Sequence, residues 1–453
     1  MSWLIKNLAK FSEKKAITDF QKDYTYFEII KQIEIYDNFL KNDIQEGEVV
    51  AIISDYNFYS ISLFLILFKK KCIIVPVVSK IIEQTNQKIK IAMVEKIINI
   101  SSTGALSINK NEIKNKNTLV NKIQKQKSSG LILFSSGSAG NPKAMIHNLD
   151  NLVDSFKGKK VRNLNILVFL LFDHIGGLNT MLNALSIGAH LVLPINRNAE
   201  SIAALIQKHK INILPTSPTF LNMMLIENVV EKFDLSSLKM ITYGTEQMQK
   251  SILMKLKKTF PKTRLLQTFG TSETGIAQTE SFSSESLKIK IKDPNQEMKI
   301  VNNELWLRSK TQVLGYLNAK MDKFTADGWF KTGDIVEDTQ DGYILVVGRK
   351  KEIINVGGEK VHPSEIETVL LEMPEIEDCA AYSVKNVITG QSVAVKIVLK
   401  KNIDISQVKK IVRDYCKKRI ENYKVPTKIN VVDKIEFTER FKKNRKNNAD
   451  IKI

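Results

Sequence analysis

Short apolar segments alternate with helix-forming segments along most of this chain, and that alternation limits the fold more than any other feature of the sequence. Val49–Ile53 is a run of apolar, largely β-branched residues, typical of a buried strand. A helix with apolar residues spaced over 29–40 precedes it, and a second helix near 59–68 leads into an apolar strand at 72–78. Because strands that alternate with helices pair mostly in parallel, the sequence predicts an α/β fold.

The alternation returns later and then gives way to other patterns. Further strands are expected at 166–172, 190–193, 211–214, near Leu238 and at 264–267, with helices between them. Residues 84–128 are rich in Lys, Asn, Gln and Ile with weak periodicity, so we expect an irregular connection there. Short strands and turns over 299–347 indicate a β subdomain, and a helix from Pro363, two strands and a helix at 406–420 indicate a separate lobe. We therefore expect a large N-terminal domain at 1–347, made of parallel-sheet α/β layers plus the β subdomain, and a small α+β C-terminal domain at 348–453.

Charge and composition exclude several classes of protein. The chain has 453 residues, 43% of them hydrophobic, and 68 Lys and Arg against 48 Asp and Glu give a net charge of +20. The basic residues are spread along the chain and are not interleaved with aromatic residues, so we expect a solvated surface that attracts anionic substrates, and no nucleic-acid partner.

The N-terminal segment and the cysteines bear on the location of the protein. The first fifteen residues lack a continuous apolar segment, and the apolar run at 61–68 is too short to cross a bilayer, so neither a signal peptide nor a membrane span is expected. The three cysteines have no CxxC spacing, which indicates neither a disulfide framework nor a zinc site and fits a cytoplasmic location.

The segment LILFSSGSAGNPK at 131–143 carries the first chemical signal. An apolar strand breaks into small residues and ends on a lysine; the residues of interest are Ser135, Ser136, Gly137, Ser138, Gly140 and Lys143. Small residues leave backbone N–H groups free to approach a polyphosphate, and the lysine adds a positive charge. Ala144 follows Lys143, so the spacing is not that of the Walker loop, and taken alone the segment is also consistent with an ordinary surface loop.

Four further motifs follow this loop in a fixed order. They are Phe269-Gly270-Thr271-Ser272-Glu273, Thr332-Gly333-Asp334, Gly348-Arg349-Lys350-Lys351, and Gly357-Gly358 with Pro363. Together with the loop at 135–143 they resemble the adenylate-forming superfamily of acyl-CoA synthetases, non-ribosomal adenylation domains and luciferases. The resemblance extends from about Tyr24 to Arg445, and it implies that the C-terminal domain is mobile.

The resemblance implies an ATP site that uses Mg²⁺. Phe269, beside Gly270, would stack on adenine, although a core aromatic is the plainer reading. Ser272 would contact a phosphate, and Glu273 would hold Mg²⁺. The alternative for Glu273 is an acid exposed to solvent with no ligand. Asp334 would accept the two ribose hydroxyls, although without Thr332 and Gly333 it would be read as an ordinary turn aspartate. Arg349 would support the ribose or the phosphate.

The C-terminal domain carries the remaining implied roles. Lys351 occupies the hinge position, and Gly357-Gly358 would face the thiol. The family pattern Thr-x-x-Gly-Lys-x-x-Arg aligns with residues 438–445, and the resemblance therefore implies that Lys442 is the catalytic lysine. Phe441 replaces the glycine of that pattern, Lys443 is a rival one residue away, and a merely solvated lysine is the alternative.

The acid site is expected near Asp173 and His174. His174 matches the position beside the acyl carbonyl, against the alternative of a structural histidine. Asp173 follows a phenylalanine, as does the aspartate that binds the α-amino group in amino-acid-activating relatives. The alignment that assigns this role to Asp173 differs by one residue from the alignment that places His174 beside the acyl carbonyl, so only one of the two can hold. Tyr243 and Thr245 flank Gly244, where fatty-acyl members of the family often have smaller residues. The resemblance therefore implies a shortened pocket and a small or polar acid.

The resemblance therefore implies an ATP-dependent carboxylate–thiol ligase. The acid would form an acyl-adenylate, and the thiol of coenzyme A, or the phosphopantetheine arm of an acyl carrier protein, would then take the acyl group. A non-catalytic adenylate-binding relative is the alternative suggested by Phe441, although the presence of Asp334, Glu273 and Lys143 argues against it. A basic nucleic-acid-binding protein is a distant third.

Overall fold

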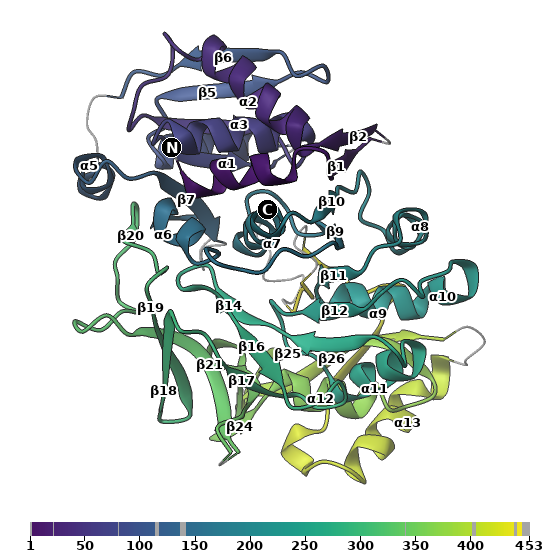
Figure 1. Cartoon of the computed structure of the whole chain (residues 1–453). Helices are drawn as coiled ribbons and strands as arrows, with labels where there is room; N and C mark the ends of the chain where they lie inside the picture. Colours follow the sequence, from purple (N-terminus) through teal and green to yellow (C-terminus); the bar gives the residue numbers. More distant parts are fainter. Residues whose placement is uncertain are drawn as a thin grey trace.

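The computed structural model describes residues 2–20, 22–79, 81–113, 117–135, 142–339, 341–400, 405–438 and 442–445. Within them, two seven-stranded sheets form the N-terminal part (Figure 1). The first has the order β13-β12-β11-β9-β10-β1-β2 and is parallel except for the β1–β2 pair. Its strands are β1 (Lys15–Asp19), β2 (Lys22–Thr25), β9 (Asn165–Leu167), β10 (His190–Val192), β11 (Ile213–Thr216), β12 (Met240–Tyr243) and β13 (Arg264–Gln267).

The second sheet has a parallel centre and antiparallel edges. Its order is β20-β8-β7-β4-β3-β5-β6, with β7, β4, β3 and β5 in parallel. Its strands are β3 (Val49–Ile53), β4 (Ile73–Val77), β5 (Lys96–Ile100), β6 (Leu106–Lys110), β7 (Gly130–Ser135), β8 (Lys143–Asn148) and β20 (Gly315–Tyr316). The parallel strands confirm the predicted α/β class, while both sheets also carry antiparallel edges that the sequence did not predict.

Helices between the sheets supply one large apolar core. Side chains of α1 (Trp3–Leu8), α2 (Tyr26–Phe39), α3 (Phe58–Lys69), α6 (Leu149–Asp154) and α7 (Ile175–Ile187) pack with residues of both sheets. Ten side chains of α3 are buried, because this helix is apolar on every face. Figure 1 shows α7 at the centre of the molecule, between the two sheets.

Two predictions for the N-terminal part are wrong. Residues 84–128 are not an irregular connection: they contain α4 (Ile82–Ile91), β5, β6 and α5 (Thr118–Lys125). None of the residues of α4 is buried, so its apolar periodicity is weak. The strand expected at 166–172 ends at Leu167, and the apolar residues after it are buried without belonging to the sheet.

The predicted β subdomain and C-terminal lobe are both present. The subdomain is an antiparallel sheet of β16 (Thr279–Ser281), β17 (Lys288–Ile291), β18 (Gln296–Val301), β19 (Glu304–Ser309), β21 (Phe330–Asp338) and β22 (Ile344–Arg349). The lobe has a sheet of β23 (Ile354–Val356), β24 (Glu359–Val361), β25 (Ile376–Asn386), β26 (Gly390–Leu399) and β27 (Lys428–Val431). Helices α12 (Pro363–Leu370) and α13 (Ile405–Lys417) complete it.

The lobe packs against the N-terminal part through a shared apolar cluster. This cluster joins residues of α8 (Ala199–His209), α9 (Pro218–Ile226) and α11 (Lys250–Thr259) to residues of α12, β25 and β26. In Figure 1, α12, α13 and β24 of the lobe lie at the lower end of the molecule, opposite β5 and β6 at the upper end.

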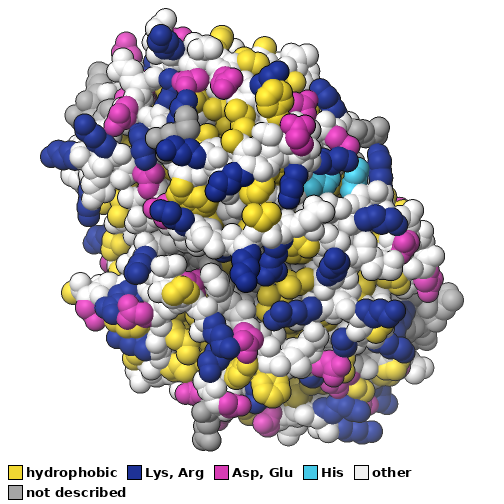
Figure 2. Space-filling model, viewed as in Figure 1, with side chains coloured by type: hydrophobic (Ala, Val, Ile, Leu, Met, Phe, Trp, Pro, Cys, Tyr) yellow, Lys and Arg dark blue, Asp and Glu magenta, His cyan; other side chains and the backbone are white. Residues whose placement is uncertain are grey.

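The surface agrees with the predicted spread of charge. On the face shown in Figure 2, Lys and Arg side chains are distributed among acidic and apolar ones and do not form a single basic stripe. Within the described parts of the chain, the helices are too short or too polar for any of them to cross a bilayer.

Candidate active site

A β-hairpin holds the base of the predicted phosphate loop. Strands β7 and β8 are antiparallel, and Ser135 is the register partner of Lys143. The predicted loop residues Ser136, Gly137, Ser138 and Gly140 lie outside the described residues. The pairing places Lys143 directly at the base of that loop, with its Nζ 5.7 Å from the centroid of the Tyr316 ring.

Tyr316 links Lys143 to Glu273. The Tyr316 hydroxyl donates to Oε1 of Glu273 at 2.9 Å, and β20 holds Tyr316 beside β8 through its pairing with Met145. Burial, followed by the charge of Glu273, raises the pKa of Tyr316, so this hydroxyl remains a donor at neutral pH. Only one oxygen of Glu273 is used by Tyr316.

Asp334 and Arg349 form the second charged centre. They are register partners on β21 and β22, with Arg349 Nε 2.8 Å from Asp334 Oδ1 and Nη2 3.5 Å from Oδ2. Burial raises the pKa of Asp334, and the guanidinium of Arg349 opposes that effect. Gly333 has a φ of +77°, a left-handed conformation that suits glycine, and the Asp334 N–H donates to Thr332 Oγ1 at 3.0 Å.

A short hairpin presents the 269–273 motif. Strands β14 (Phe269–Thr271) and β15 (Gly275–Ala277) pair so closely that a Cβ on Gly270 would lie 2.6 Å from the Gly275 carbonyl oxygen. Phe269 is half-buried at the edge of the apolar core of the β subdomain. This is the packing role that the sequence offered as the alternative to adenine stacking. Its stacking on adenine, and the phosphate contact of Ser272, stay predictions.

Unpartnered polar atoms gather at the carboxyl ends of β11, β12 and β13. Thr216, Tyr243 and Gln267 are register neighbours at the last positions of these strands. Buried atoms without a hydrogen-bond partner include the hydroxyls of Thr216, Thr219 and Thr245 and Oε1 of Gln267. Unpaired buried polar atoms are costly, and the carboxyl edge of a parallel sheet is where ligands bind. The structure therefore offers a polar ligand site at this edge.

His174 is the N-cap of α7. Its Nδ1 accepts from the Gly176 N–H at 3.0 Å, so in the neutral ring the proton resides on Nε2. The imidazole is buried, and its fixed tautomer makes Nε2 a hydrogen-bond donor. His174 therefore has the structural role that was the alternative to acid binding. This role is compatible with a contact between its Nε2 and an acid.

Asp173 already has a cationic partner. Its Oδ2 lies 3.0 Å from Nζ of Lys88 on α4, and both side chains are largely buried. Oδ1 of Asp173 is buried without a hydrogen-bond partner. No pattern in the sequence pointed to Lys88, because it lies 85 positions away from Asp173 on a helix with weak periodicity.

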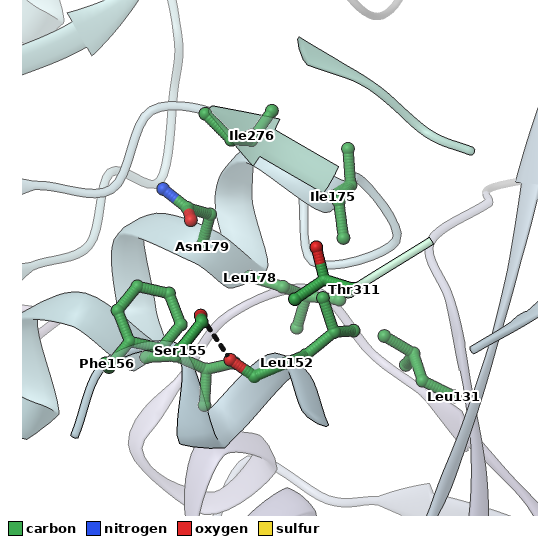
Figure 3. Close-up of a pocket in the computed structure, with 10 residues that line it drawn as sticks. Leu131, Leu152, Ser155, Phe156, Ile175, Leu178, Asn179, Ile276 and Thr311 are labelled. Atoms are coloured by element: carbon green, nitrogen blue, oxygen red, sulfur yellow. Dashed lines mark hydrogen bonds between the residues drawn. The ribbon is translucent and has the colours of Figure 1, made fainter. Parts of the chain in front are cut away.

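The predicted acid-pocket residues Asp173, Tyr243 and Thr245 do not line the small cavity shown in Figure 3. That cavity measures about 20 Å³, lies beside α6, α7 and β15, and is mostly apolar; its lining includes Leu152, Phe156, Ile175, Leu178 and Ile276. Tyr243 instead packs in the apolar core at 1% exposure, while Thr245 adopts a φ of +72°. Because 20 Å³ holds about one water, side chains must move before an acid can enter.

Lys443 and Arg445 anchor the C-terminal tail. Nζ of Lys443 lies 2.6 Å from Asp378 Oδ1 and donates to the Cys379 carbonyl at 2.8 Å. Arg445 makes two 2.8 Å hydrogen bonds to Glu367, which is 0% exposed, and a third contact to Glu352. Lys443 is therefore paired with Asp378 inside the lobe. Lys442, which precedes it in the chain, is half-buried.

The tail also touches the N-terminal part. The Lys443 N–H donates to Glu246 Oε2 at 3.3 Å, and Gln249 Nε2 donates to Glu367 Oε2 at 2.9 Å. Glu246 follows β12, so these contacts bring the Lys442 segment to the carboxyl edge of the first sheet. Burial raises the pKa of Glu246, and the hydrogen bond that the Thr219 N–H donates to its Oε1 opposes that effect. Phe441 lies outside the described residues.

The remaining predicted residues lie on the surface of the hinge and lobe. Lys351 is exposed in the short 3₁₀ turn Lys350–Glu352, immediately after β22. Gly357 and Gly358 are exposed in a turn between β23 and β24, and the Gly357 N–H donates to the Thr389 carbonyl. In this arrangement neither glycine contacts Lys143, Glu273 or Asp334.

Comparison with known proteins identifies relatives of both parts of the chain. Residues 69–317 match the model of the AMP-binding enzyme family, and residues 365–442 match that of the AMP-binding enzyme C-terminal domain. The chain is 29% identical over 339 residues to a probable CoA ligase, CCL5, of Humulus lupulus, a match covering 68% of this chain and 61% of the relative. It is 29% identical over 333 residues to the 2-succinylbenzoate–CoA ligase of Staphylococcus aureus strain JH9, covering 69% and 65%. These matches thus span less than two thirds of each relative's length.

A solved structure matches the whole fold. The anthranilate CoA ligase AuaEII, crystallised with anthranoyl-AMP, superposes with a TM-score of 0.80 over 97% of this chain and 95% of its own. At 19% sequence identity this likeness concerns the fold, and it confirms the α/β layers with a separate C-terminal domain.

Proposed function

Because the chain belongs to the family of AMP-binding enzymes, we propose that it is an ATP-dependent acid–CoA ligase. It would activate a carboxylic acid as an acyl-adenylate and then transfer the acyl group to a thiol. The names of the relatives support a CoA ligase, and the acyl-adenylate in the matching structure supports the intermediate. The observation that carries the proposal is the docking of the tail: Lys443 and Arg445 fix the segment of Lys442 against the carboxyl edge of the first sheet.

In the first half-reaction, an oxygen of the acid attacks the α-phosphorus of ATP. The bond from that phosphorus to the bridging oxygen breaks, and pyrophosphate leaves. Lys442 would neutralise the charge that develops at the α-phosphate, since Lys443 is already engaged by Asp378. No covalent intermediate on the protein is needed, and catalysis is positioning plus charge neutralisation.

The charged centres fit the parts of ATP. Asp334, held by Arg349, would accept the ribose hydroxyls, and Phe269 would stack on the adenine. Ser135, Lys143 and Ser272 would contact phosphate oxygens, together with the loop that joins β7 to β8. The unpartnered hydroxyls of Thr216 and Thr245 would gain partners when the ligand binds.

Glu273 fits a magnesium ion carried by the nucleotide. Tyr316 uses only Oε1, and a carboxylate is a ligand that Mg²⁺ prefers. The described residues contain no group of three or more His, Cys, Asp or Glu that could hold a metal alone. Phosphate oxygens and water would supply the other ligands, as is usual for Mg²⁺. Held by Glu273, Mg²⁺ would supply positive charge that offsets part of the negative charge of the phosphates.

The acid is proposed to be small, with an apolar body. Nε2 of His174 would donate to the acid carboxylate, and the apolar cavity beside α7 would extend to receive the rest of the molecule. Lys88 already pairs with Asp173, which favours a simple acid over an amino acid. If Asp173 instead binds an ammonium group, Asp173→Ala would impair the use of alanine more than the use of propionate.

The second half-reaction is assigned to a rearranged C-terminal domain. We propose that the domains at 1–347 and 348–453 move about Lys351, so that the turn at Gly357-Gly358 replaces the tail at the active site. The thiol would then attack the acyl carbon, and AMP would leave. Coenzyme A is the proposed acceptor, with a carrier-protein pantetheine arm as the second candidate; the buried, unpaired cysteines are consistent with a cytoplasmic enzyme.

The test is release of pyrophosphate from ATP and Mg²⁺ across a panel of fatty, aryl and amino acids. We expect release only when a suitable acid is present, and thioester only when coenzyme A is added as well. ATP binding without acid-stimulated release for any member of the panel would refute the ligase.

A further inference from the structure

Glu246 joins the N-terminal part of the chain to the tail that carries Lys442, although none of the motifs includes it. Its Oε1 accepts from the Thr219 N–H at 2.8 Å, and its Oε2 accepts from the Lys443 N–H at 3.3 Å. Thr219 is the second residue of α9, where the backbone N–H groups have no partner within the helix and favour a carboxylate. One oxygen of Glu246 is therefore held by α9, and the other is presented to the tail.

The tail around Lys442 has a fixed local conformation. The Lys442 N–H donates to Thr438 Oγ1 at 3.4 Å, and the Lys442 carbonyl accepts from the Thr438 N–H at 2.9 Å. The ammonium of Lys443 pairs with Asp378 of the lobe. All of these contacts lie within the lobe, so they fix the shape of the tail and not its position over the first sheet. The hydrogen bond from the Lys443 N–H to Glu246 crosses the boundary between the two parts, one residue from Lys442.

Glu246 also adjoins the polar ligand edge of the first sheet. Thr219 and Glu246 face Lys443 and Arg445 across the boundary between the two parts. The hydroxyls of Thr219, which binds the carboxylate through its N–H, and of Thr245, which precedes Glu246, are buried and have no hydrogen-bond partner among the described residues. A ligand that supplied partners to these hydroxyls would lie beside the carboxylate that holds the tail.

We infer that Glu246 is a positioning residue for acyl-adenylate formation, an assignment that rests on the proposed function. By accepting the Lys443 N–H, Glu246 sets the place at which Lys442 meets the α-phosphate. The hydrogen bond requires the docked arrangement of the lobe, so it is made in the first half-reaction and broken when the lobe rearranges for the second. Because Glu246 acts through the tail, its loss should lower the rate of the first step and leave the affinity for ATP unchanged.

The first experiment follows hydrogen exchange of lysine backbone amides by NMR, in the full chain without substrates. In Glu246→Ala, the Lys443 amide should exchange about tenfold faster, because a charge-assisted hydrogen bond is lost. The Lys442 amide is the internal control and should keep its rate, since it donates to Thr438 within the tail. Glu246→Gln preserves the shape of the side chain but loses its charge and one acceptor, so it should show the same change with a smaller size.

The second experiment measures the two half-reactions separately in single turnovers. Glu246→Ala should slow adenylate formation about tenfold at saturating ATP. Thioester formation from a pre-made acyl-adenylate, and the affinity for ATP, should stay unchanged. Glu227→Ala is the matched control, because Glu227 is the C-cap residue at the opposite end of α9, and it should change none of these quantities.

Three outcomes would overturn the inference. The first is an unchanged exchange rate of the Lys443 amide in both Glu246 variants. The second is an equal loss in the two half-reactions, which would indicate a merely structural role for Glu246. The third is the same selective loss in Glu227→Ala. The exchange measurement needs no acid, so its result is separate from a failure of the wild-type chain to activate any acid, which would refute the ligase itself.

Discussion

Lys443 is almost fully buried and paired with Asp378, whereas Lys442, the proposed catalytic lysine, is half-buried. Lys442→Ala should slow acyl-adenylate formation on the order of 10²-fold or more, because a charge contact made in the transition state is lost. Thioester formation from a pre-made acyl-adenylate should change much less. Single-turnover measurements of each half-reaction test this split.

Lys443→Ala provides the comparison. Its ammonium is 3% exposed and pairs with Asp378, so its removal leaves a carboxylate without its partner. Breaking such a pair costs about 3–5 kcal/mol of stability, and we expect a lower urea midpoint for this variant. If Lys443→Ala were stable and selectively deficient in adenylate formation, the catalytic lysine would be Lys443.

At the scale of elements, Asp19 makes a pH-dependent link between β1 and α3. Its Oδ2 accepts from the Phe58 N–H at 2.9 Å, at the first residue of α3. Burial raises the pKa of Asp19 to about 6, and this hydrogen bond opposes the shift. The folded state therefore holds the proton more tightly than the unfolded chain, and the free energy of unfolding falls as pH rises from about 4 to about 6.

Asp19→Asn should remove that dependence while keeping an acceptor for Phe58. The measurement is urea unfolding of both proteins between pH 4 and pH 7. We expect similar stability at pH 4 and a relative gain for Asp19→Asn above pH 6. A stability difference that stays constant across the range would contradict the assigned pKa.

Elements and site residues with a local signal were predictable from sequence. Short strands with an apolar run, such as 49–53 and 264–267, lie where the pattern placed them. Asp334 and Arg349 stand in motifs that the sequence shows, and the register of β21 and β22 pairs them. Lys88, Tyr316 and Glu246 had no such signal, because their contacts join distant segments of the chain. The helix α4 was missed because none of its residues is fully buried, so burial imposes little pattern on its sequence.

At the scale of the whole molecule, Gln249 is a link between the two parts of the chain. Its side chain is 3% exposed, and it donates across the boundary to Glu367, the carboxylate that also holds Arg445. If adenylate formation uses the docked arrangement of the lobe, this hydrogen bond stabilises the first half-reaction and is lost in the second. A hydrogen bond to a charged group contributes about 1.5–3 kcal/mol, which corresponds to a tenfold or larger change in the docked population.

Gln249→Ala should therefore slow adenylate formation about tenfold and leave thioester formation from a pre-made acyl-adenylate unchanged or faster. Arg445 and the Ala381 N–H still hold both oxygens of Glu367, so the lobe itself should stay folded. Gln247→Ala is the matched control, because its amide donates to the Val346 carbonyl within the N-terminal domain and crosses no boundary. Single-turnover rates for both half-reactions decide the matter. Equal losses in the two steps, or the same split in Gln247→Ala, would show that this contact does not favour one arrangement of the domains over the other.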